Sequence, residues 1–402
     1  MSPTRAVPSR WQMSAASRVR IGEQVLRWCR EPDVARLAVE TTRWSDVEWH
    51  AARFAVQAHG VGPWLHRRFA GAPATAPPVV AFLHYLGQCH ALNLERYALW
   101  RSELEGVLTA AGPKIPLVAL KGAAILPTLW AEPWLRPTSD IDLLARPADR
   151  RALDAAVTGL GWTLQGEVPR HRTFYLTRLG LTPCSDIGEH PGQPLRLEIH
   201  EHARQRFLGL EHDPTAALWQ GATPVPLGVA TMWMPPAAAL FEHVLLHAAF
   251  DLAKRMTRFI RLEDLRLLAG RLSAADWSTL VARAQAARLG PFVLAPLVMA
   301  ARYLEPIAPD PVVRTLEAGA PRALVARLRH APLSSFTVCG SHGARLANAW
   351  SRVRWLPPRS WAHGARRLLL PSRAERLDEF AAIGQAPSLW SYYRAQAARW
   401  RG

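Results

Sequence analysis

Apolar residues recur at helical spacing through the first quarter of the chain. The spacing is clearest near the end of this stretch, where apolar residues lie three or four positions apart: Tyr97, Trp100, Leu104, Val107 and Leu108. Prolines and glycines near residues 32, 60–63 and 71–78 divide the stretch into several helices. The pattern predicts an N-terminal helical region at residues 19–112, after a disordered, arginine-biased tail at residues 1–18.

Strand-like patterns replace the helical spacing over residues 113–230. An apolar run at residues 117–120 and the segment SDIDLL at residues 139–144 are the first two predicted strands. Three later runs (TLQGEV, RTFYLTRL and LRLEIH) are bounded by glycine and proline. In the last run the side chains alternate between two faces, with Leu195, Leu197 and Ile199 on one and Arg196, Glu198 and His200 on the other.

Helical spacing returns after residue 230. An apolar stripe (Phe241, Val244, Leu245, Ala248 and Leu252) runs beside a polar stripe (His243, His247, Asp251 and Lys254). The pattern predicts a helical region at residues 231–310 that lines a substrate cleft. Residues 311–402 are predicted to form a helical C-terminal region rich in arginine and tryptophan. The order of elements is that of an α+β protein.

The basic charge of the chain has a particular origin. The formal net charge is +17, yet only three of the 49 Lys and Arg residues are lysine, as in proteins from GC-rich bacterial genomes. The charge therefore reflects composition in part, and in part predicts attraction to phosphates. The four cysteines are isolated, which fits reduced thiols in a cytoplasmic protein. No apolar run reaches the ~20 residues of a membrane span, so none is predicted.

Two aspartates occupy alternate positions of the second predicted strand. Asp140 and Asp142 point to the same face, about 7 Å apart along the strand, while Ile141 points to the opposite face. Two like charges repel, and burying them without a partner is unfavourable. A divalent metal ion between the carboxylates resolves both problems, so this pair is the sharpest functional signal in the chain.

A third carboxylate lies on the polar face of a later predicted strand, at Glu198. A glycine turn at the head of a helix, an aspartate pair on the following strand and a third acid on a later strand are the layout of a metal-dependent nucleotidyl transfer site. There two Mg²⁺ ions hold the attacking and leaving oxygens. Asp140 and Asp142 would bind both metals. Glu198 would bind the acceptor-side metal and help to deprotonate the acceptor hydroxyl. The alternative is a structural network of ion pairs with nearby arginines.

A turn between the first strand and the next helix offers a phosphate site. Backbone N–H groups at a helix N-terminus attract anions, Gly122 allows close approach of the backbone, and Lys121 adds a positive charge. Arg136 is either a phosphate clamp or a solvated loop residue. A Lys-Gly pair at a strand end can also be an ordinary turn.

These segments resemble the signature of a known family. The run LKGAA at residues 120–124, Arg136, and the run SDIDLL at residues 139–144 are similar to the LKGaa…R…DiDlLv signature of the uncharacterised nucleotidyltransferase family. That family belongs to the polymerase-β-like nucleotidyltransferase superfamily. LEIH at residues 197–200 is similar to its later h-[DE]-h-H segment, and the helical segments after residue 242, with Asp264, resemble its C-terminal part. The similarity is expected to span about residues 20–300.

The resemblance implies a small mixed β-sheet nucleotidyltransferase core flanked by N- and C-terminal helical regions. It also implies Mg²⁺, with Mn²⁺ as a substitute, and an NTP donor. The acceptor is left open between a small molecule, a peptide or protein, and an RNA. One departure is Ala123, which stands where the superfamily usually has a serine or glycine, so no hydroxyl contacts the donor phosphate.

Two other interpretations follow from these features. The first is a catalytically impaired nucleotide-binding or scaffolding protein of the same fold, which the missing hydroxyl permits. The second is an RNA-binding protein that acts through its arginine-rich C-terminal region. That region can instead be a helical cap whose arginine stems cover apolar surface.

The histidines of the polar stripe have several possible roles. His243 and His247 are four residues apart, the spacing of two zinc ligands on a helix, but the sequence shows no obvious third ligand. Alternatively this stripe lines the substrate cleft together with Asp264. His200 shares the face of Glu198 and is predicted to orient the acceptor or to have a structural role.

Overall fold

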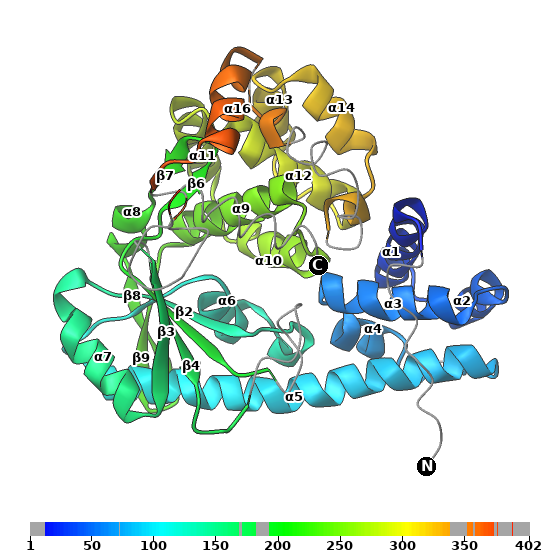
Figure 1. The fold of residues 1–402 in the computed structure, drawn as a ribbon, viewed down its shortest axis with the longest axis horizontal. Helices are drawn as coiled ribbons and strands as arrows, with labels where there is room; N and C mark the ends of the chain where they lie inside the picture. Colours follow the sequence, from blue (N-terminus) through cyan, green and yellow to red (C-terminus); the bar gives the residue numbers. More distant parts are fainter. Residues whose placement is uncertain are drawn as a thin grey trace.

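The computed structural model describes residues 13–71, 73–168, 171–181, 193–337, 352–356, 358–373, 376 and 388. A mixed β-sheet lies at one end of the molecule, a long helix runs beneath it, and two groups of helices lie beside and above it (Figure 1). The structure confirms the predicted α+β class and the mixed sheet.

Within the described residues the main sheet has seven strands in the order β3-β4-β5-β2-β1-β9-β8. Two pairings are parallel, β2 with β5 and β1 with β9, and the others are antiparallel. The strands are β1 (Val118–Ala119), β2 (Asp140–Leu144), β3 (Trp162–Val168), β4 (His171–Leu176), β5 (Arg196–His200), β8 (Thr223–Leu227) and β9 (Ala230–Met234). A separate two-stranded sheet pairs β6 (Gln205–Phe207) with β7 (Leu210–His212).

The N-terminal part of the described chain is helical. Its helices are α1 (Ala15–Arg30), α2 (Val34–Thr41), α3 (Asp46–His59), α4 (Gly62–Arg68) and the 35-residue α5 (Pro77–Ala111). Helix α5 spans from these helices to the sheet (Figure 1). The indole of Trp100, fully buried on α5, donates a hydrogen bond to the backbone oxygen of Asp140 at 2.9 Å, and Arg96 donates to the backbone oxygen of Thr138. Helix α5 therefore fixes the start of the strand that carries the two aspartates.

The predicted tail at residues 1–18 is shorter than expected. Helix α1 begins at Ala15, and the side chain of Ser14 accepts a hydrogen bond from the backbone N–H of Ser17 as its N-cap. Ile21 and Val25 of α1 are fully buried, which anchors the helix to the core. The prediction is therefore wrong from Ala15 onwards, because the cap and the buried face outweigh the basic composition. Residues 1–12 lie outside the described part.

Helix α7 packs against α5 and β3 at the side of the sheet, whereas α9 and the helices that follow it stack above the sheet (Figure 1). The α-helices are α6 (Lys121–Leu129), α7 (Arg150–Gly159), α8 (Thr215–Trp219), α9 (Ala237–Lys254), α10 (Phe259–Ala269), α11 (Ala274–Ala286), α12 (Gly290–Tyr303), α13 (Asp310–Ala318), α14 (Arg322–His330) and α16 (Trp361–Leu369). Short 3-10 helices are η2 (Pro133–Leu135), η3 (Pro147–Asp149), η4 (Leu333–Phe336) and η6 (Pro358–Ser360). Among the described helices, none has the length and apolar character that crossing a membrane requires.

The described part of the arginine- and tryptophan-rich C-terminal region packs against apolar surface. Trp355 is 1% exposed and stacks on Phe292, with ring centroids 5.6 Å apart. The guanidinium of Arg327 lies over the ring of Phe336, 4.8 Å from its centroid. These contacts favour the predicted helical cap for this part of the chain. Trp350, Trp390 and Trp400 lie outside the described residues.

Buried His59 joins the N-terminal helices to η4 and makes stability depend on pH. Its Nε2 lies 3.3 Å from the hydroxyl of Ser334, and burial, followed by the charge of Arg258, lowers its pKa from 6.5 to about 3. Protons therefore bind preferentially to the unfolded chain, and the stabilisation present above pH 6.5 is lost as the pH falls. From about pH 7 to pH 5, we expect this residue to reduce the free energy of unfolding by about 2 kcal/mol.

Urea unfolding of the wild type and of His59→Gln at a series of pH values measures this effect. The difference between the free energies of unfolding of the wild type and of His59→Gln should decrease by that amount from pH 7 to pH 5. His50→Gln, a change at a half-buried histidine of the same helix, is the control and should leave the pH profile parallel to that of the wild type. Parallel profiles for His59→Gln would contradict the assignment.

Candidate active site

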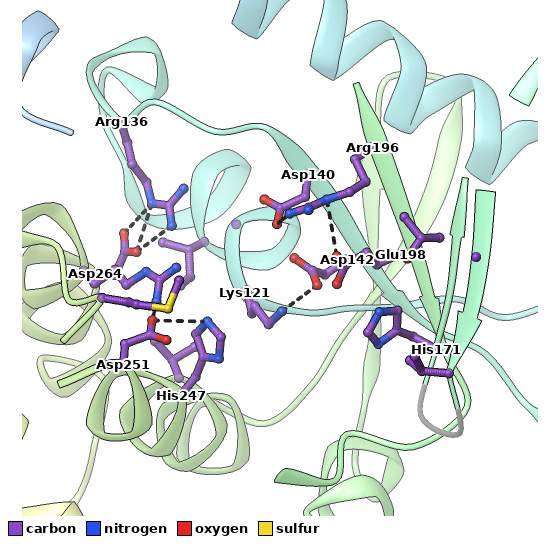
Figure 2. A pocket seen from close by; sticks show the side chains of 18 of the residues that line it. Lys121, Arg136, Asp140, Asp142, His171, Arg196, Glu198, His247, Asp251 and Asp264 are labelled. Carbon is purple, nitrogen blue, oxygen red and sulfur yellow. Dashed lines mark hydrogen bonds and ion pairs between the residues drawn. The ribbon is translucent and has the colours of Figure 1, made fainter. Parts of the chain in front are cut away.

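A polar pocket of about 500 Å³ lies between the sheet and helices α6, α9 and α10. Figure 2 shows Asp140, Asp142, Glu198 and His171 on one side of it and Asp264, Asp251 and His247 on the other, with Lys121 between them. Of the candidate site residues predicted from the sequence, nine line the pocket: Lys121, Gly122, Arg136, Asp140, Asp142, Glu198, His247, Asp251 and Asp264. Pockets of this size hold small polar or drug-sized ligands.

Strand pairing brings the three predicted acids together. Strands β2 and β5 run parallel, with Asp140 opposite Arg196 and Asp142 opposite Glu198. Paired residues point to the same face of a sheet, so Glu198 joins Asp140 and Asp142 at the pocket. The side chains of Asp142 and Glu198 are only 2% and 13% exposed.

Each acid has a cationic neighbour. Lys121 donates from Nζ to Oδ1 of Asp142 at 2.7 Å, and Nε2 of His200 lies 3.0 Å from the same oxygen. Arg196 donates from Nη2 to Asp140 at 2.9 Å, and its Nε lies 3.3 Å from Glu198. The site therefore contains both the acid triplet and the ion-pair network that was considered as its alternative.

These neighbours keep the buried acids ionised. Burial alone would raise the pKa of Asp142, but the charge of Lys121 and the hydrogen bond to His200 outweigh burial and lower it. Burial likewise acts to raise the pKa of Glu198. The hydrogen bond to His200 and the charges of Lys121, His171 and Arg196 lower it well below its usual range. Burial acts to lower the pKa of Lys121, whereas the carboxylates raise it.

The residues present fit a divalent cation. The Lys121 ammonium already donates to one oxygen of Asp142, which marks a position that attracts a cation. The surrounding ligands are ionised carboxylates, the hard oxygen donors that Mg²⁺ prefers. Competition with the Lys121 ammonium is expected, because both would occupy the same side of Asp142.

The turn at Lys121 is strained. Lys121 starts helix α6 with φ of 43°, in the left-handed region that long side chains rarely adopt. Gly122 follows, and a Cβ atom there would lie 3.3 Å from Nη1 of Arg136, so glycine allows the guanidinium to approach the backbone. Ala123 is fully buried behind this turn and does not line the pocket. Lys121 thus combines a strained backbone conformation with an ion pair to Asp142.

Two variants at Lys121 separate the backbone strain from the charge. Lys121→Gly and Lys121→Ala both remove the ammonium, but only glycine adopts positive φ without cost. We expect Lys121→Gly to be more stable than Lys121→Ala by about 1–2 kcal/mol in urea unfolding. As a control, the same pair of changes at Lys114, an exposed residue outside the pocket, should not favour glycine. Equal stability of the two Lys121 variants would contradict the strain.

Arg136 pairs with the carboxylate of Asp264, whereas the sequence suggested a phosphate or solvent as its partner. Its Nε and Nη2 each donate to the carboxylate of Asp264 at 2.8 Å, and the indole of Trp130 donates to the same carboxylate. The Arg136 and Asp264 side chains are 11% and 2% exposed. The solvated-loop alternative for Arg136 is therefore wrong. This pair joins the loop before β2 to helix α10.

The polar stripe of α9 divides between two environments. His243 is 3% exposed and lies against Gln205, with Nδ1 at 3.3 Å from the amide nitrogen, and burial lowers its pKa to about 3. His247 lies in the pocket, 3.7 Å from Asp251, which also pairs with Arg261. His243 and His247 thus have separate partners. In the described part of the chain they belong to no group of three metal-ligating side chains, so the zinc interpretation gains no support.

Arg261 and His171 are among the pocket residues that sequence reasoning missed. Arg261 of α10 reaches Asp251 of α9, and no pattern in the sequence links these helices. His171 of β4 lies opposite His200 of β5 in the antiparallel register. The alternation of His171, Thr173 and Tyr175 along β4 was a signal, since all three line the pocket.

A family model described as uncharacterised nucleotidyltransferase matches residues 45–305. The chain belongs to this family. The match confirms the resemblance seen at the motifs and assigns the chain to NTP-using nucleotidyl transfer as a general activity. It includes every residue of the pocket and ends before the arginine-rich C-terminal region.

Comparisons with individual proteins add less to the family assignment. No curated protein matches the chain. Among solved structures, one match is the solution structure of an antibiotic-resistance factor, ANT(2'')-Ia, at 20% identity and a TM-score of 0.33. It covers 48% of this chain and 95% of the other. At that TM-score the likeness carries no argument about this nucleotidyltransferase.

Proposed function

We propose that this nucleotidyltransferase moves a nucleoside monophosphate from an NTP to a hydroxyl group of an acceptor, with Mg²⁺ or Mn²⁺ as the metal. The observation that supports it best is the acid triplet: Asp140, Asp142 and Glu198 meet on one wall of the pocket through the parallel pairing of β2 and β5. No other group of acids in the described pocket lies on adjacent strands.

The reaction is a displacement at phosphorus. The acceptor oxygen forms a bond to the α-phosphorus, the bond from that phosphorus to the bridging oxygen breaks, and pyrophosphate leaves. Asp140 and Asp142 would hold the metal, which supplies positive charge to the phosphate oxygens. Glu198, ionised by its neighbours, would hold the acceptor-side metal and accept the acceptor proton.

The donor phosphates would bind at the start of α6. The first N–H groups of a helix point out of its N-terminus and bind anions, and Gly122 lets a phosphate approach them closely. When the metal binds, the Lys121 ammonium would leave Asp142 and contact the donor phosphates. It would thus stabilise the leaving pyrophosphate. Arg136 borders this corner through Nη1, while its other nitrogens hold Asp264. His200, within reach of Asp142 and Glu198, would orient these acids.

The test is pyrophosphate release by the full chain with each NTP and Mg²⁺ or Mn²⁺. The acceptor is supplied in three arms: small polyhydroxyl compounds, peptides, and RNA. We expect release that needs both the metal and one class of acceptor, with the matching nucleotide attached to that acceptor by mass spectrometry. Tight NTP binding without release in any arm would favour the catalytically impaired alternative. RNA binding that is lost with residues 322–402, again without release, would favour the RNA-binding alternative.

A further inference from the structure

Two histidines face each other across strands β4 and β5 beside the acid triplet. In the antiparallel register His171 is opposite His200, and Thr173 is opposite Glu198. Opposed residues point to the same side of a sheet, and residues two apart along a strand also share a side. The two imidazole centroids are 4.9 Å apart. His171, Glu198 and His200 therefore form one group on the pocket side of the sheet.

The atoms of this group are close enough to share one ion. One ligand atom from each of His171, Glu198 and His200 can be chosen so that all three lie within 4.8 Å of one another. The Glu198 and His200 atoms are 3.5 Å apart, and Asp142 lies 3.0 Å from the same His200 nitrogen. His171, Glu198 and His200 belong to paired strands β4 and β5 of one sheet, which holds their backbones in register.

The ligand types select a different metal from the one expected at Asp140 and Asp142. Two imidazoles and one carboxylate are typical ligands of Zn²⁺, Co²⁺ and Mn²⁺, whereas Mg²⁺ prefers oxygen donors. Three protein ligands leave an open coordination position, the arrangement of a catalytic site and not of a closed structural one. His171 and Glu198 line the pocket, so an open position would face the substrate.

We propose that His171, Glu198 and His200 form a transition-metal site that takes Zn²⁺, Co²⁺ or Mn²⁺ in preference to Mg²⁺. This inference deepens the proposed function and rests on it, because Glu198 belongs both to the acid triplet and to the proposed transition-metal site. The site would hold the acceptor-side metal, and Asp140 with Asp142 would hold Mg²⁺ on the donor side. The binding of the ion itself needs no NTP and no turnover, so it can be tested separately.

A second histidine pair provides a matched control. The rings of His66 and His90 also lie 4.9 Å apart and tilted, on helices α4 and α5, but within the described residues no acid joins them as a third ligand. Two nearby imidazoles are common to both places, and the carboxylate is present only at the proposed site. Removing one imidazole from each pair therefore distinguishes specific metal binding at the proposed site from non-specific binding to histidines.

Isothermal titration of the full, metal-stripped chain with Zn²⁺, and separately with Mg²⁺, tests the proposal. We expect one tight Zn²⁺ ion per chain. His171→Ala should weaken it by at least about 100-fold, since loss of even an indirect partner of a metal ligand costs 10–100-fold. His90→Ala should leave Zn²⁺ binding unchanged, and His171→Ala should leave Mg²⁺ binding unchanged. Absence of tight Zn²⁺ binding, or an equal loss in both variants, would overturn the proposal.

A measurement on the wild type covers the case in which His171→Ala does not fold. Pulsed electron paramagnetic resonance of bound Mn²⁺ should show couplings to imidazole nitrogens, and their absence would overturn the proposal. Failure of the histidine site and failure of the proposed function give different results. Metal bound through nitrogen without pyrophosphate release would reject the function alone, whereas release supported by metal without nitrogen couplings would reject the histidine site alone.

Discussion

Replacing Asp142 with asparagine is expected to lower the rate of pyrophosphate release by at least about 10³-fold, equivalent to several kcal/mol of lost charge stabilisation. Asp142 is the most buried of the three acids. Its Oδ1 accepts a hydrogen bond from the Lys121 ammonium and lies 3.0 Å from Nε2 of His200. Asparagine keeps the volume and one acceptor oxygen for Lys121, but it removes the charge that holds a metal. The loss should therefore appear as a lower rate and not as a change of fold.

Three measurements complete this prediction. Pyrophosphate release is compared under saturating NTP and metal, and the free energy of urea unfolding and the metal affinity are measured in parallel. Asp46→Asn, at an exposed position on α3 that lies outside the pocket, is the matched control and should retain full activity. An Asp142→Asn protein that releases pyrophosphate at the wild-type rate would remove Asp142 from the mechanism and with it the main support for the proposed function.

Replacing Asp264 with leucine should lower the free energy of unfolding by about 3–5 kcal/mol, because it leaves a buried arginine without its partner. Arg136 donates hydrogen bonds to this carboxylate from two nitrogens, and both side chains are almost fully buried. The double variant Arg136→Met/Asp264→Leu removes both charges and should recover much of the loss. Full recovery is not expected, since Trp130 also donates to Asp264.

Chemical denaturation of the single and double variants measures this coupling. The control is the pair Arg329 and Glu317, which also makes a two-pronged contact but has its arginine 56% exposed. Glu317→Leu should change stability by no more than about 1 kcal/mol, because water screens and solvates the exposed guanidinium. Similar decreases in the free energy of unfolding for Asp264→Leu and Glu317→Leu would contradict the prediction that a buried arginine without its partner is especially destabilising.

The sequence by itself determined the candidate acids and the class of fold. The alternation of Asp140, Ile141 and Asp142, and of Leu197, Glu198 and Ile199, is a local property of a strand. A side chain's face follows from its position alone once the strand is recognised. The helical regions on both sides were likewise visible, because period-3.6 spacing is local to each helix. The family signature lies within these same local patterns and was confirmed.

Only the tertiary structure decided what faces these residues. The pairing of β2 with β5 and of β5 with β4 sets Glu198 beside Asp142 and His171 opposite His200, and no local pattern fixes strand order or register. Arg136 and Asp264 are 128 positions apart, so their contact depends on how α10 docks on the core. The polar stripe of α9 splits between buried His243 and pocket-lining His247 for the same reason. The periodicity of apolar and polar residues is a local property of the sequence. Which side chains contact one another across the pocket depends on packing between segments that are distant in sequence.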